Sequence, residues 1–196
     1  NCPEAVIGML ATASLGAIWS SCSPDFGING IYDRLGQISP KILITVNAYY
    51  YNGKEHDCLL KIREIVIRIP SIESVFIVPF TETIIKFKGN EQAWGKLLNS
   101  SACTVNFAQL PFDHPLYILY SSGTTGLPKS IVHGAGGTLL KHLTEHRYHT
   151  DVHPGDRIFF FTTCGWMMWN WLVSSLASGA TLILYDGAPG FPDIGR

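Results

Sequence analysis

Tyr120-Ser121-Ser122-Gly123-Thr124-Thr125-Gly126-Leu127-Pro128-Lys129 is the most informative stretch of this 196-residue chain. It follows an apolar run, Pro115 to Tyr120, that predicts a buried strand. The glycines allow the backbone to approach a ligand closely, and successive backbone amides form a concave anion site. A Gly/Ser/Thr run is often only a flexible linker, but here a strand precedes it and Pro128-Lys129 closes it. The stretch therefore predicts a strand that ends in a phosphate-binding loop.

Two common phosphate loops do not fit this spacing. A Walker A loop, G-x-x-x-x-G-K-[ST], counted from Gly123 would place its second glycine at Pro128. Proline has no backbone N–H and a fixed φ, so it supplies neither that amide nor that turn. A dinucleotide-binding G-x-G-x-x-G motif fails because Gly123 and Gly126 lack a third glycine at the required spacing. A P-loop NTPase and a Rossmann protein are both disfavoured.

The loop and its flanks resemble the acyl-adenylate-forming enzymes, and within them the short-chain acyl-CoA synthetases. The signature Tyr-Ser-Ser-Gly-Thr-Thr-Gly-x-Pro-Lys is long and specific, and the match runs from about Asn1 to Pro189. Two segments are most similar to family members that activate acetoacetate, namely 16–27 and 163–171. The final residues, Gly190 to Arg196, match nothing in the family. Further matching segments are 119–133 with Gly136-Gly137, 153–157, Gly165-Trp166 and 176–181.

This resemblance implies carboxylate activation in two steps. Acetoacetate attacks the α-phosphate of ATP, bound with Mg²⁺, to give acyl-AMP and pyrophosphate, and coenzyme A then displaces AMP. Stabilising the leaving pyrophosphate is mainly an electrostatic task. The resemblance makes Lys129 the catalytic cation. It assigns nucleotide binding to Ser121, Ser122, Gly123, Thr124, Thr125, Gly126 and Lys129.

A cluster of large apolar side chains between residues 166 and 171 provides a second group of site candidates. Such residues at helical spacing usually belong to a core. Five large side chains within six positions cannot all face one side of a helix, and an aromatic wall suits a small acyl group or an adenine ring. The resemblance places this segment along the acyl and nucleotide pocket. The candidate substrate-binding residues are Trp166, Met168, Trp169 and Asn170.

The segment His142-Leu143-Thr144-Glu145-His146 spells H-x-x-E-H, an inverted zinc-protease pattern. On a helix the two imidazoles would share a face and could bind zinc, with Glu145 as a base. No downstream carboxylate helix supplies a third ligand, so a zinc hydrolase is the third hypothesis and we expect no metal site here. The simpler interpretation is a solvated helix face that carries Lys141, His142, Glu145 and His149.

Composition describes a soluble globular chain. The apolar fraction of 46% is ample for a core, and a formal charge of -1 gives no basis for nucleic-acid binding. The longest apolar stretch, Ala5 to Trp19, is too short to span a bilayer, so no membrane insertion is expected. Five dispersed cysteines without C-x-x-C spacing suggest reduced thiols and a cytosolic location.

Apolar strands alternate with helical patterns, which predicts an α/β fold with mostly parallel strands and flanking helices. By resemblance, this is an incomplete N-terminal region of the adenylate-forming fold. We expect 1–110 to be part of a first α/β subdomain, 111–189 part of a second one with the phosphate loop, and 190–196 an unmatched tail. The expected helices are 3–15, 28–37, 58–67, 136–149 and 166–177. The expected strands are 17–21, 41–46, 73–79, 115–120, 130–133, 157–162 and 180–185, with 81–109 as a surface excursion. Asn52-Gly53 is expected to form a tight turn.

Three elements of the family are missing from these residues: a Tyr-Gly-x-Thr-Glu stretch, a ribose-binding Asp and a mobile C-terminal domain with a catalytic Lys. We therefore interpret the chain as a fragment of an AMP-forming acetoacetate–CoA ligase whose C-terminal part lies outside it. The alternative is a truncated, non-catalytic product with at most weak nucleotide binding. In both cases the chain alone is expected to be inactive.

Overall fold

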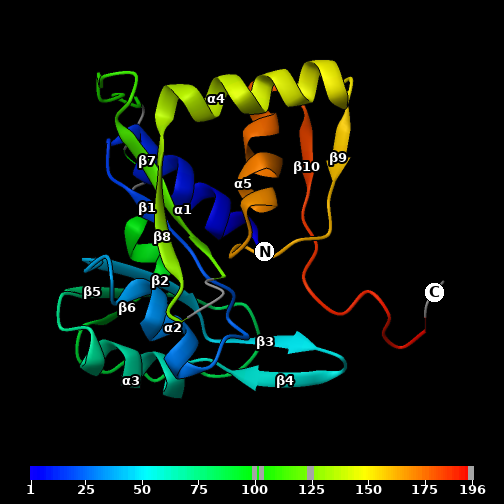
Figure 1. Ribbon diagram of the computed structural model, residues 1–196. Coiled ribbons are helices and arrows are strands. Elements are labelled where there is room, and N and C mark those ends of the chain that lie inside the picture. Colours follow the sequence, from blue (N-terminus) through cyan, green and yellow to red (C-terminus); the bar gives the residue numbers. More distant parts are fainter. Residues whose placement is uncertain (99–100, 102–103, 123–125, 194–196) are drawn as a thin grey trace. The chain divides into compact units, whose positions relative to one another are not determined.

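The computed structural model describes residues 1–98, 101, 104–122 and 126–193 (Figure 1). Contacts divide the chain into two compact units, of which unit 1 contains 1–23 and 105–185, and unit 2 contains 24–104 and 186–196. Unit 1 thus combines segments that lie far apart in the sequence. The subdomain boundary near residue 110 stays a prediction, because packing units within this chain do not define the domains of a longer protein.

The central sheet of unit 1 has the strand order β1-β7-β8. β1 (Trp19–Ser20) pairs in parallel with β7 (Pro115–Ser121), and β7 pairs antiparallel with β8 (Lys129–Gly134). The segment 122–128, which is predicted to bind phosphate, is called the phosphate loop below. The pairing confirms that the strand entering this loop lies beside the strand that leaves it. Because Ser121 pairs with Lys129, both ends of the loop emerge from the same edge of the sheet.

Helices and a second, two-stranded sheet complete unit 1. The helix α4 begins where β8 ends and passes across α5 toward β9 (Figure 1). Gly179, with φ of 76°, takes the left-handed conformation that ends the helical segment after α5. The bounds are α1 Pro3–Ser14, α4 Ala135–Thr144 with a π-helical turn Glu145–His149, α5 Met167–Ser174 with a 3₁₀ turn Ser175–Ser178, and parallel β9 Arg157–Phe159 and β10 Thr181–Ile183.

The core of unit 1 is formed by α1, β7 and α5. The Trp169 side chain is fully buried and stacks on Trp19 with ring centroids 6.4 Å apart. Its indole Nε1 donates a hydrogen bond of 2.9 Å to Asn1 Oδ1, which satisfies the one polar atom of the ring. The buried cluster comprises Val6, Met9, Tyr117, Leu119, Trp169 and Val173.

Unit 2 contains a parallel sheet of order β2-β5-β6, a β3-β4 hairpin and two helices. Asn52 and Gly53 both have positive φ, 51° and 73°, as the predicted tight hairpin turn requires. The bounds are α2 Ile28–Leu35, β2 Ile42–Val46, β3 Ala48–Tyr51, β4 Lys54–Asp57, α3 Leu59–Arg68, β5 Ser74–Val78, β6 Glu91–Ala93 and a 3₁₀ turn Trp94–Leu97.

The expected α/β class with mostly parallel strands and flanking helices is confirmed. The interpretation of 81–109 as a surface excursion was wrong in part, since β6 extends the sheet beside β5 and Trp94 packs with Phe76 and Val78. β6 is short and is held by backbone pairing, so it leaves no alternating pattern in the sequence. In the described part of the chain, no helix is long and apolar enough to cross a membrane.

Asn47 is a buried polar hub at the end of β2. Its side chain is fully buried, and its Nδ2 donates to the carbonyl oxygens of Thr81 and Thr83, each at 3.0 Å. Its Oδ1 accepts hydrogen bonds from the backbone N–H groups of Phe80, at 2.8 Å, and Thr81, at 3.1 Å. This one amide therefore ties the segment after β5 to the end of β2.

Replacing Asn47 by Ala should lower the free energy of unfolding by about 3 kcal/mol, because several buried backbone groups lose their partner together. Urea denaturation of the purified chain measures the change. Lys54→Ala, an exposed hairpin position, is the control and should leave the midpoint nearly unchanged. Equal midpoints for Asn47→Ala and the control would contradict this account.

Candidate functional site

The ends of the phosphate loop are open to solvent. Ser122, Gly126 and Lys129 are exposed, and Ser121 is half-buried at the end of β7. Gly126 has φ of 151°, a conformation that glycine adopts readily. Exposed hydroxyl, backbone and cationic groups at one sheet edge fit the approach of a phosphate group. The predicted residues Gly123, Thr124 and Thr125 lie outside the described residues.

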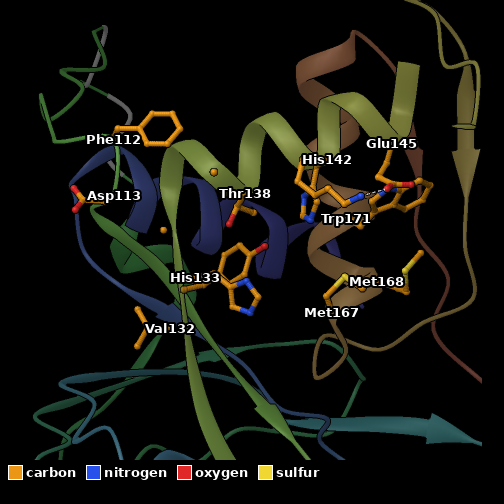
Figure 2. Close-up of a pocket in the computed structure, with 14 residues that line it drawn as sticks. Phe112, Asp113, Val132, His133, Thr138, His142, Glu145, Met167, Met168 and Trp171 are labelled. Atoms are coloured by element: carbon orange, nitrogen blue, oxygen red, sulfur yellow. Dashed lines mark hydrogen bonds and ion pairs between the residues drawn. The ribbon is translucent and has the colours of Figure 1, made fainter. Parts of the chain in front are cut away.

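A cavity of about 820 Å³ lies within unit 1, between β8, α4 and α5. Figure 2 shows its lining side chains, with His133 on β8, His142 on α4, Glu145 in the π-helical turn after α4, and Met167, Met168 and Trp171 on α5. The lining is mixed, since methionine and tryptophan side chains face histidines and hydroxyls. The remaining lining residues are Phe112, Asp113, Tyr117, Val132, Gly134, Gly137, Thr138 and Lys141.

The sheet side of this cavity is set by strand register. Tyr117 on β7 pairs with His133 on β8, and their ring centroids are 5.1 Å apart. Burial raises the pKa of the Tyr117 hydroxyl to about 12, with nearby Thr138 opposing the shift, and burial lowers the pKa of His133. Both groups are therefore neutral near pH 7, so this wall offers hydrogen bonds rather than charge.

On the helix side of the cavity, the expectation that the H-x-x-E-H segment forms a solvated face was wrong for His142. His142 and His146 are buried, with 7% and 0% of their surface exposed. His142 Nδ1 lies 2.8 Å from Ser174 Oγ, and His146 Nε2 lies 3.0 Å from the Trp171 carbonyl oxygen. Only part of the expected face is therefore solvated. Lys141 and Glu145 form an ion pair on its more exposed side.

Burial also fixes the protonation of these imidazoles. The pKa of His142 is lowered to about 4, first by burial and then by the nearby His146 and His133, with Glu145 opposing. Burial likewise lowers the pKa of His146, while its hydrogen bond to Trp171 opposes the shift. Within the described residues, no group of three or more His, Cys, Asp or Glu is placed to hold a metal ion. Among the described residues, the structure therefore offers His142 and His146 no third side chain for a zinc site.

The predicted acyl-binding residues point in different directions. Trp166 is 65% exposed, whereas Met168 is half-buried and lines the large cavity. Trp169 belongs to the core, and Asn170 is fully buried with Nδ2 3.5 Å from the Trp166 carbonyl oxygen. Trp169 and Asn170 line neither that cavity nor a smaller one of about 200 Å³ beside Phe160 and Phe161, which Trp166 and Met168 both line.

Several cavity residues were not among the predicted binding residues, although Met167 and Trp171 belong to the apolar cluster between residues 166 and 171 that was identified in the sequence. Tyr117, Thr138, Met167 and Trp171 line the cavity, and only the strand register and the packing of α4 on α5 bring them together. Gly165 marks a close packing contact in this region of the sequence. A Cβ atom there would lie 2.9 Å from the Ser23 backbone nitrogen. Glycine is required there by close backbone approach, just before α5 begins.

The AMP-binding enzyme family matches residues 1–195. The match includes 190–195, so the expectation that this end of the chain resembles nothing in the family was wrong. The chain belongs to the AMP-binding enzyme family. It is 54% identical over 204 residues to acetoacetyl-coenzyme A synthetase from Rhizobium meliloti (strain 1021). The aligned region covers 98% of this chain and 30% of that protein. It is 49% identical over 198 residues to malonamoyl-CoA synthetase vrtB from Penicillium aethiopicum, covering 96% of this chain and 27% of that protein.

Among solved structures, acetoacetyl-CoA synthetase from Streptomyces lividans superposes with a TM-score of 0.93 at 47% identity. The alignment covers 98% of this chain and 29% of that one. The chain thus spans less than a third of the length of these AMP-binding relatives. Family membership and the fold predicted from the resemblance are confirmed by this match.

The free energy of unfolding of the chain should fall as the pH is lowered from about 6.5 toward 4. The unfolded imidazole has a pKa of about 6.5, whereas the pKa of folded His142 is about 4. Between these values the unfolded state binds more protons, so stability that is present above pH 6.5 is lost as the pH falls. Urea titrations at stepped pH measure this slope.

Two matched variants assign the slope to its source. His142→Asn removes one titrating imidazole and should flatten the decline. His149→Asn changes an exposed histidine of the same helical segment and should leave it unchanged. A wild-type slope in His142→Asn would show that this histidine is not held neutral by burial.

Proposed function

We propose that this chain is the loop-bearing part of an AMP-forming ligase that activates acetoacetate and transfers it to coenzyme A. The main support is 47% to 54% identity to acetoacetyl-CoA synthetases over 98% of the chain. That alignment includes both the phosphate loop and the Trp/Met segment. The reaction is assigned to the full-length enzyme, of which these residues form a part.

In this proposal the phosphate loop holds ATP, bound with Mg²⁺, through its β- and γ-phosphates. Ser121, Ser122 and the hydroxyls of the loop donate hydrogen bonds, and Lys129 contributes the positive charge that balances the departing pyrophosphate. The exposed position of Lys129 at the start of β8 supports this role. ATP supplies the adenylyl group, and coenzyme A supplies the thiol that takes the acyl group.

The acid is proposed to bind against the N-terminal end of α5. Trp166 and Met168 are the favoured acyl contacts, because both line a cavity. Asn170 and Trp169 support this end of the helix from inside instead. The acetoacetyl and malonamoyl groups named in the two kinds of relative share a carbonyl β to the activated carboxyl. A β-carbonyl is therefore the substrate feature we assign to this site.

The cytosol is the proposed location of the enzyme. Among the described cysteines, Cys2, Cys22, Cys58 and Cys164 form no disulfide. Dispersed free cysteines are typical of a reducing compartment.

Lys129→Ala in the full-length enzyme should lower turnover by roughly a hundredfold to a thousandfold, because about 3–4 kcal/mol of transition-state stabilisation is lost. Pyrophosphate release with ATP, magnesium and acetoacetate measures turnover, and thermal denaturation verifies the fold. Lys54→Ala is the charge-matched control. Unchanged turnover in a stable Lys129→Ala enzyme would remove the loop from the mechanism.

Acetoacetate should be preferred over butyrate, which has the same chain length and lacks the β-carbonyl. A site that forms a hydrogen bond to a substrate group rejects analogues without that group strongly, whereas an apolar slot discriminates weakly. Competition between the two acids for acyl-CoA formation by the full-length enzyme gives the ratio of kcat/KM values. Equal kcat/KM values for the two acids would leave the ligase assignment standing and refute recognition of the β-carbonyl.

A further inference from the structure

The helices α4 and α5 are joined by a short hydrogen-bond network that ends on one carbonyl group. Ser174 Oγ donates to the Trp171 carbonyl oxygen at 2.7 Å, and His146 Nε2 lies 3.0 Å from the same oxygen. His142 Nδ1 lies 2.8 Å from Ser174 Oγ. The His146 ring also packs against Trp171, with centroids 4.8 Å apart. Both histidines of the H-x-x-E-H segment thus form hydrogen bonds with α5.

The partners determine which ring nitrogen of each histidine carries the proton. A carbonyl oxygen only accepts, so His146 must donate to it through Nε2–H. Ser174 uses its single hydroxyl proton on the Trp171 carbonyl, so its oxygen must accept from Nδ1–H of His142. The two neighbouring imidazoles are therefore held as opposite neutral tautomers, Nδ1–H in His142 and Nε2–H in His146.

This network adjoins the large cavity, because two of its members, His142 and Trp171, also line that cavity. α5 begins at Met167, and Met167, Met168 and Trp171 all line that cavity. The carbonyl group that receives both donors belongs to Trp171 itself. A shift or rotation of α5 relative to α4 would therefore displace the methionines, and Trp166 just before them.

We propose that His142 and His146 are positioning residues that set the orientation of α5 and thereby the affinity for the acid. They act through α5 and do not contact the reacting atoms. The inference rests on the proposed function, because it assumes that the acid binds at the N-terminal end of α5. It gives the H-x-x-E-H segment a structural role in recognition.

Amide side chains can replace each donor selectively in the full-length enzyme. The amide nitrogen of Asn occupies a position close to Nδ1 of histidine, and that of Gln a position close to Nε2. His142→Asn and His146→Gln should keep their hydrogen bonds and a KM for acetoacetate within about threefold of wild type. His142→Gln and His146→Asn should raise that KM about tenfold, as expected for a buried hydrogen bond worth roughly 1.4 kcal/mol.

The KM for ATP separates positioning from general damage, because it should stay within about twofold in all four variants. Ser174→Ala removes the acceptor of His142, so in that background His142→Asn and His142→Gln should give the same KM for acetoacetate. His149→Ala, an exposed change in the same helical segment, should leave both KM values unchanged.

Three results would overturn the proposal: equal effects of Asn and Gln at each position, parallel rises in the KM for acetoacetate and for ATP, or a lowered Tm with an unchanged KM for acetoacetate. Each of these means that the network only stabilises the fold. Failure of the wild-type enzyme to form acetoacetyl-CoA would instead refute the proposed function.

Discussion

The antiparallel pairing of β7 with β8 is the constraint on which the rest of unit 1 depends. Its register places Ser121 opposite Lys129 at one end and Tyr117 opposite His133 toward the other. The first pair brings the two ends of the phosphate loop together, and the second forms a wall of the large cavity. Because neighbouring side chains of a strand alternate between faces, a shift of one residue would disrupt both. Phosphate loop and cavity are therefore two results of one strand pairing.

Burial keeps the imidazoles between α4 and α5 neutral. His142 and His146 both have pKa values below the ordinary range of imidazole, and both hold a hydrogen bond to α5. A buried charge is costly unless it is paired, so the neutral forms are the ones compatible with this packing. The ion pair of Lys141 with Glu145 lies beside them on a more exposed part of α4. This helical segment thus packs neutral imidazoles against α5, while Lys141 and Glu145 pair with each other at the more exposed rim of the cavity.

Much of this fold could be predicted from the sequence, because its strands and helices carry their own periodicity. The strand 115–120, the loop and the strand 130–133 were predicted close to their observed bounds, and the Asn52-Gly53 turn was predicted correctly. The burial of His142 could not be predicted, since its partner Ser174 lies 32 positions later on another helix. For the same reason Trp169 could not be distinguished from Trp166 as the core residue. Side-chain direction there depends on tertiary packing, which local patterns do not contain.

The parallel pairing of β1 with β7 has a consequence for the order of assembly. Ser20 donates a hydrogen bond to the carbonyl group of Ile118, 98 positions further along the chain. A ribosome delivers the N-terminal side first, so α1 and β1 emerge long before their neighbours in the sheet exist. The intervening residues 24–104 supply most of unit 2, which has its own sheets and core. Contacts of such long range are formed slowly, and their segments stay exposed meanwhile. The apolar helix Pro3–Ser14 therefore lacks its core partners on β7 and α5 until those segments have been synthesised.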